Sequence, residues 1–124
     1  MSMENNKGYH QLKVWQKCRL FVKSIYVLTE LFPKSEVFGL TSQLRRAVVS
    51  VLLNIVEGDR RSSRKEFLRF LDTADGSLAE VEACLELALD LSYITNKEFE
   101  KVNLDREEIA KMLMGLMRSV QKNL

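Results

Sequence analysis

Apolar residues recur along most of the chain at spacings of three and four residues, which place them on one face of a helix. Pro33 is the only proline, and there are five glycines in 124 residues, so few positions interrupt these runs. The pattern predicts four helices, over residues of about 12–32, 40–57, 63–92 and 95–121. Four helices with short links favour an all-α, up-down-up-down antiparallel four-helix bundle, with residues 1–124 forming one domain.

Residue types at the predicted helix ends support these boundaries. Pro33 ends the first helix, because its ring clashes with the preceding turn. Gly58 is expected to end the second helix by adopting the left-handed conformation. Two capping boxes, Ser63-Arg-Lys-Glu66 and Thr95-Asn-Lys-Glu98, begin the third and fourth helices. In each box the hydroxyl accepts from the glutamate amide, and the glutamate side chain reaches back.

The second helix carries more apolar residues than its core-facing side needs. That side holds Leu44, Ala47, Val48, Val51 and Ile55. A further apolar set on the flank and back comprises Val49, Leu52, Leu53 and Val56. A helix that is apolar nearly all round is buried nearly all round, and each buried Val or Leu contributes about 1.5–3 kcal/mol. The sequence therefore predicts a homo-oligomer with the second set in its interface. An uneven bundle that covers this helix itself is the alternative.

Polar residues form a narrow stripe on the second helix, consisting of Arg46, Ser50, Asn54 and Glu57. Polar groups beside so much apolar surface need partners, because an unsatisfied buried one costs about 1–3 kcal/mol. Ser50, Asn54 and Glu57 are therefore assigned a structural role at the helix end or against a neighbouring helix. Ligand binding is the alternative.

Charge is distributed unevenly on the third helix. Its start gathers the basic residues Arg60, Arg61, Arg64, Lys65 and Arg69. Its remainder carries the acidic residues Asp72, Asp75, Glu80, Glu82, Glu86 and Asp90. This order opposes the helix dipole, which indicates another use for the basic end. Three interpretations stay open: a surface for phosphates, a contact with the acidic end of an adjacent subunit, and a solvated face.

Small residues in the interior of the third helix form a strip of Gly76, Ala79 and Ala83. Such a strip allows a second helix to approach closely, from the same chain or from another copy. Glycine in a helix interior costs about 1 kcal/mol relative to alanine.

Composition narrows the class of protein. The net charge of +2 means that any nucleic-acid surface is a local patch. Cys18 and Cys84 lie in apolar helical runs, where a free cysteine behaves as a small buried hydrophobe. No apolar run approaches the roughly 18 residues of a membrane span, and the first residues lack the order of a signal peptide. A cytoplasmic protein without a membrane partner is expected.

The sequence contains few of the motifs that would indicate an enzyme. His10 is the only histidine, so the Glu-x-x-His pairs of a di-iron bundle are absent from the sequence. There is no glycine-rich phosphate loop and no nucleophile with a base at a recognisable spacing. A carboxylate pair of Glu57 with Glu80 or Glu82 is open until the fold is known. The sequence therefore predicts no enzyme, no metal and no cofactor.

Four sequence blocks between Leu12 and Ile94 resemble a known family. They are Val-Trp-Gln, Leu-Thr-Ser-Gln-Leu-Arg-Arg-Ala, Ser-x-x-x-Asn-Ile-x-Glu-Gly and Gly-Ser-Leu-Ala-Glu. The chain resembles the 23S rRNA intervening-sequence proteins, also called S23-type proteins. This resemblance implies a four-helix bundle, encoded in intervening sequences of bacterial ribosomal RNA genes or elsewhere in bacterial genomes, with no established enzymatic activity.

The same family is similar to the accessory protein of diversity-generating retroelements. That protein is a barrel-shaped homopentamer whose basic surface binds nucleic acid and a reverse transcriptase. The similarity implies a homo-oligomeric ring, a pentamer, for this chain. It also implies contact with RNA or DNA through Arg45, Arg46, Arg60, Arg61, Arg64, Lys65 and Arg69. The alternative is a protein-interaction scaffold with a protein partner and no nucleic-acid role.

Overall fold

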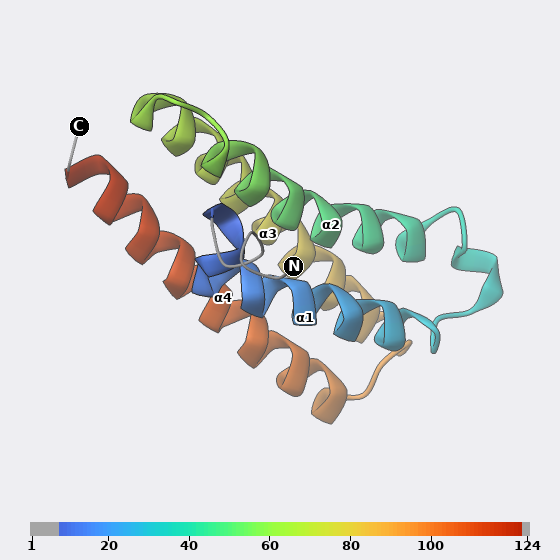
Figure 1. Cartoon of the computed structure of the whole chain (residues 1–124). Coiled ribbons are helices and arrows are strands. Elements are labelled where there is room, and N and C mark those ends of the chain that lie inside the picture. Colours follow the sequence, from blue (N-terminus) through green and yellow to red (C-terminus); the bar gives the residue numbers. More distant parts are fainter. Residues whose placement is uncertain (1–7, 123–124) are drawn as a thin grey trace, which may run out of the picture.

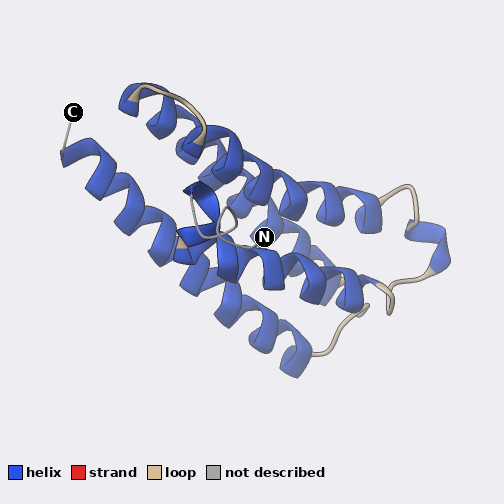
Figure 2. Cartoon of the chain, in the orientation of Figure 1, coloured by secondary structure: helices blue, strands red, loops and turns tan. Residues whose placement is uncertain are grey.

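The computed structural model describes residues 8–122, and these residues contain helices and no strand (Figure 2). The four long helices are α1 (Lys13–Thr29), α2 (Leu40–Asp59), α3 (Arg64–Asp90) and α4 (Asn96–Lys122) (Figure 1). Two short 3-10 helices, η2 (Gly8–Gln11) and η3 (Lys34–Glu36), precede α1 and α2. All four predicted helices are therefore confirmed, with bounds that differ by a few residues.

The helices surround one core. α1 and α3 each pack against both α2 and α4, so α1 and α3 lie across the bundle from each other. The side-chain oxygens of Ser50 and Ser77 lie 2.9 Å apart, and Gln43 donates a 2.8 Å hydrogen bond to Glu80. Residue numbers fall along α2 as they rise along α3 in these contacts. These two helices therefore run in opposite directions.

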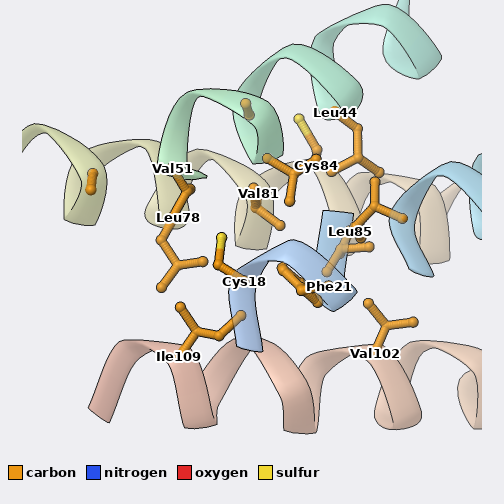
Figure 3. Packing of buried hydrophobic residues seen from close by; sticks show 14 of the residues in the cluster. Cys18, Phe21, Leu44, Val51, Leu78, Val81, Cys84, Leu85, Val102 and Ile109 are labelled. Atoms are coloured by element: carbon orange, nitrogen blue, oxygen red, sulfur yellow. The ribbon is translucent and has the colours of Figure 1, made fainter. Parts of the chain in front are cut away.

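The core consists of the predicted apolar faces, seen together in Figure 3. All five core candidates of α2 are buried, as are Leu71, Ala74, Leu78, Val81, Leu85 and Ala88 of α3. Phe67, Phe99 and Leu116 are half-buried at the edge of the core. One charged residue, Arg106, occupies a buried position on the inner face of α4. The hydrophobic pattern therefore predicted the core well, apart from this arginine.

The predicted capping box at Thr95 forms in full, and the one at Ser63 forms in part. Thr95 Oγ1 accepts the Glu98 amide at 3.1 Å, and Glu98 accepts the Thr95 amide at 2.8 Å. Ser63 Oγ accepts the Glu66 amide at 3.0 Å. The Glu66 carboxylate, however, accepts from Arg69 at 2.7 Å. The first contact of the Ser63 box is thus confirmed, while its glutamate pairs with an arginine.

The prediction that Gly58 ends α2 in a left-handed conformation is wrong. α2 continues to Asp59, and Gly8 is the only glycine with a positive φ among residues 8–122. Gly58 instead lies where α3 packs tightly against α2. A Cβ atom there would lie 2.9 Å from Phe67 Cδ1 and 3.0 Å from Phe70 Cβ. The position requires glycine because of this tertiary contact.

Candidate nucleic-acid interface

Five basic side chains gather around the turn between α2 and α3, and we call them the hairpin cluster: Arg60, Arg61, Arg64, Lys65 and Arg69. All five are exposed. α2 ends at Asp59 and α3 begins at Arg64, so four of them lie within six consecutive residues. The structure therefore brings this predicted set together at one end of the bundle.

Local packing fixes the shape of this turn. The hydroxyl of Ser63 caps α3, and the close approach of Gly58 to Phe67 and Phe70 holds the two helices together just before it. The Arg61 guanidinium lies over the Phe70 ring, 4.8 Å from its centroid. The basic side chains therefore project from a tightly closed helical hairpin.

The five charges differ in how far they are already paired. Arg61 donates to Glu57 and Arg69 donates to Glu66, each at 2.7 Å. Across residues 8–122, Arg60, Arg64 and Lys65 take part in no salt bridge. Exposed pairs contribute little and exchange readily with other anions. Three free cations and two weakly paired ones are thus available to an anionic partner.

Asp59 lies beside the cluster and opposes its positive field. Burial raises the pKa of the Asp59 carboxyl above its ordinary value. The backbone of Gly8 lies close by, since a Cβ atom built there would be 3.3 Å from Asp59 Oδ2. Removal from water therefore makes the negative charge of Asp59 less favourable than that of an exposed aspartate.

Arg45 and Arg46 were predicted to share this surface, and the structure does not bring them to it. Arg45 donates to Thr29 Oγ1 at 2.8 Å and to Glu30 at 3.2 Å, and lies over the Tyr26 ring. It thus holds α1 against α2. Arg46 borders a hollow that also contains Tyr26. Along α2, Arg45 is about 22 Å from Arg60 at 1.5 Å per residue.

Basic residues of α4 reach the same end of the bundle and were missed by the sequence argument. The C-terminal end of α4 lies at the end of the molecule that carries the α2–α3 turn (Figure 1). Beyond Glu108, α4 contains Lys111, Arg118 and Lys122, all exposed, and no acidic residue. The run of basic residues without acids is visible in the sequence, but only the fold places its last members, Arg118 and Lys122, at the same end of the bundle as the hairpin cluster.

The polar stripe of α2 makes structural contacts. Asn54 donates to the Ser50 carbonyl oxygen at 2.8 Å and to Ser50 Oγ at 3.2 Å, and Ser50 in turn meets Ser77 of α3. Glu57 accepts from Arg61. Ser50 therefore links α2 to α3 and Glu57 links α2 to the turn, whereas Asn54 bonds only within α2.

The acidic residues considered for a carboxylate pair have other partners. Glu80 accepts from Gln43 and Glu82 pairs with Arg106, whereas Glu57 pairs with Arg61 at the turn. The suggested carboxylate pair is therefore not formed. Within the described part of the chain, no three His, Cys, Asp or Glu side chains are arranged to hold a metal ion.

Both cysteines are free and buried, as expected. Burial raises the pKa of the Cys18 thiol to about 12, and burial together with the charge of Glu80 raises that of Cys84. Thiols with raised pKa values form little of the reactive thiolate. Packing is therefore the role that the structure gives to Cys18 and Cys84.

The α2 residues predicted for an oligomer interface are partly covered by the chain itself. Val49, Leu52 and Val56 are half-buried, and Val49 and Leu52 pack against the core. Leu53 is 55% exposed. Their role between subunits stays a prediction.

The described helices include none that is long and apolar enough to cross a membrane.

Comparisons with known proteins agree with the helical architecture. A solved structure, described as a protein of unknown function from the S23 ribosomal protein family of Bacteroides thetaiotaomicron, is 30% identical in sequence. It superposes with a TM-score of 0.76, over 84% of this chain and 97% of that one. No curated protein sequence matches the chain. Residues 10–115 match the family model described as 23S rRNA-intervening sequence protein. The chain therefore belongs to the family of 23S rRNA-intervening sequence proteins.

Proposed function

We propose that this protein is a non-enzymatic, cytoplasmic nucleic-acid-binding protein, an up-down-up-down bundle that assembles into a homo-oligomeric ring, with a pentamer as the expected size. The observation that supports binding most directly is the hairpin cluster, in which Arg60, Arg64 and Lys65 are exposed and form no salt bridge within residues 8–122. Phosphate groups are the natural partners of such cations, because each contact releases counterions from the nucleic acid.

Two further features support phosphate over another anion. Arg61 is held over the Phe70 ring, so its fork of donors is positioned before a ligand arrives. Arg118 and Lys122, in the last turns of α4, add positive charge at the same end of the bundle. A ring would repeat this surface once per subunit, and affinity for a polyanion rises with each repeated contact.

The test is fluorescence anisotropy of a labelled structured RNA and a matched DNA duplex, titrated with protein at several salt concentrations. In the double variant Arg60→Gln/Arg64→Gln, affinity should fall at least tenfold. The slope of log affinity against log salt should become shallower by about 1.8 for duplex DNA, which is about 0.9 for each lost phosphate contact.

The matched control is Lys34→Gln/Lys97→Gln, which removes the same charge from exposed positions at the opposite end of the bundle. Its affinity should remain close to that of the native chain. Absence of binding at low salt would contradict the proposal and favour a scaffold that binds a protein partner. Equal losses in both double variants would point to non-specific charge attraction in place of a defined surface.

A further inference from the structure

An apolar groove runs between α1 and α4 on the side of the bundle away from α2. Leu20 and Val27 are each 64% exposed at its edge, and Leu31 continues the same stripe of α1. The groove has a volume of about 490 Å³, with Leu28 and Val102 also among its lining residues. Large aliphatic side chains left in water at helical spacing indicate an interaction surface.

The border of this groove is mainly basic. Lys23 of α1 and Lys101 of α4 line it together with one acid, Glu98. Both lysines are exposed, and neither forms a salt bridge within the described residues. A partner that fits this groove should therefore present apolar side chains with carboxylates beside them.

The outer face of α3 has these properties. Leu87 and Leu91 are half exposed there, and the exposed Ala83 and Ala79 lie about one and two turns before Leu87, respectively. The acidic residues beside this line are Asp72, Glu86 and Asp90, which are exposed and form no salt bridge in the described part of the chain. The face is thus apolar with an acidic border, the complement of the groove.

The two surfaces also occupy the same portion of the bundle's length. Arg45 of α2 contacts Thr29 and Tyr26 of α1, while Gln43 and Ser50 of α2 contact Glu80 and Ser77 of α3. One short stretch of α2 therefore lies beside both the α1 stripe and the start of the apolar line on α3. α1 and α3 lie across the bundle from each other, so the surfaces point in different directions.

We propose that the α1–α4 groove of one copy of this chain receives the α3 outer face of the next copy. The occupant is a second copy because the same chain supplies the complementary charge and the complementary apolar surface. The two surfaces also lie at similar positions along the bundle axis. A contact between two different surfaces is heterologous. Copies joined this way without a shift along the bundle axis can close into a ring. This inference rests on the oligomer of the proposed function and names its interface.

The outer surface of α2 is a weaker candidate for the contact between subunits. Only Leu53 is exposed among the four residues predicted for the interface, and two arginines, Arg46 and Arg60, share its outer side. A subunit contact on α2 would bring these like charges toward the partner.

Complementary single variants test the pairing. Val27→Glu damages only the groove, and Ala83→Glu damages only the α3 face; both positions are exposed, so each variant should fold, as circular dichroism will show. Each variant alone should have the 14.4 kDa mass of one chain by light scattering. A mixture should form a dimer of twice that mass, because the intact groove of one variant binds the intact face of the other. Leu53→Glu is the control and should keep the mass of the native oligomer.

Two results would overturn this interface. One is a native mass in Val27→Glu and Ala83→Glu, and the other is a mixture that stays monomeric. Loss of assembly in Leu53→Glu alone would assign the interface to α2. A monomeric native chain would remove the oligomer altogether, while the anisotropy titration would still report nucleic-acid binding independently.

Discussion

The Tyr93 hydroxyl donates a 2.7 Å hydrogen bond to the carboxylate of Glu36, which joins the α1–α2 link to the α3–α4 link. Glu36 also accepts the Leu40 amide at 2.8 Å and so caps α2. The Leu40 contact, and then the Tyr93 contact, hold the pKa of Glu36 below its ordinary value. The hydrogen bond to Glu36, with burial adding to it, raises the pKa of Tyr93.

This pair predicts how stability depends on pH. A carboxylate with a lowered pKa in the folded state stabilises the protein fully above its unfolded-state pKa, and this contribution is lost as pH falls through the folded value. Glu36→Gln should therefore lower the melting temperature at pH 7, and the difference from the native chain should shrink as pH falls below about 4.5. Glu100→Gln, at an exposed position on α4, is the control and should show no such trend. A difference that grows on acidification would contradict the assignment.

Gly58 makes a second prediction, because its neighbours leave no room for a methyl group. Gly58→Ala should lower the free energy of unfolding by about 1–2 kcal/mol, since overpacking at about 1–3 kcal/mol outweighs the gain in helix propensity. Gly115→Ala is the matched control, because a Cβ there meets no atom within 4 Å. It should stabilise the chain by about 0.5–1 kcal/mol. Urea denaturation measures both, and stabilisation by both alanines would show that α3 is not packed against Gly58.

The α4 cations yield a third prediction. Arg118→Gln/Lys122→Gln should weaken nucleic-acid binding and make the salt slope shallower by up to about 1.8 for duplex DNA, if both side chains contact phosphates. The same Lys34→Gln/Lys97→Gln control applies. Unchanged affinity and slope in the α4 variant, with binding lost in Arg60→Gln/Arg64→Gln, would restrict the surface to the hairpin cluster.

Local signals explain what the sequence predicted correctly. The spacing of apolar residues and the capping patterns at Ser63 and Thr95 depend on neighbours within one helix turn. They can therefore be recognised from the sequence alone. The hairpin cluster is also local in sequence. The roles of Gly58 and Arg45 depend on Phe67, Phe70 and Tyr26, which lie on other helices or beyond the turn. Such tertiary contacts leave no periodic signal, so the prediction for Gly58 was wrong and the contacts of Arg45 with α1 were not foreseen.

The position of Arg106 in the core also depends on tertiary contacts that the sequence pattern does not reveal. It falls between Val102 and Ile109 on the inner face of α4, where the apolar spacing has a gap. The Arg106 guanidinium donates to Asn103 at 2.7 Å and pairs with Glu82 of α3 at 3.3 Å. The long aliphatic stem fills the core position while the charged group reaches the α3–α4 boundary.

A fourth prediction separates these two contributions of Arg106. Arg106→Ala should lower the free energy of unfolding by about 2–3 kcal/mol, because it removes both the packing of the stem and the polar contacts. Arg106→Leu restores apolar volume and should cost less than about 1 kcal/mol, since Glu82 is exposed enough to regain water. Denaturant unfolding of both variants measures the difference. Equal destabilisation by alanine and leucine would show that the ion pair, and not the packed stem, stabilises the contact between α3 and α4.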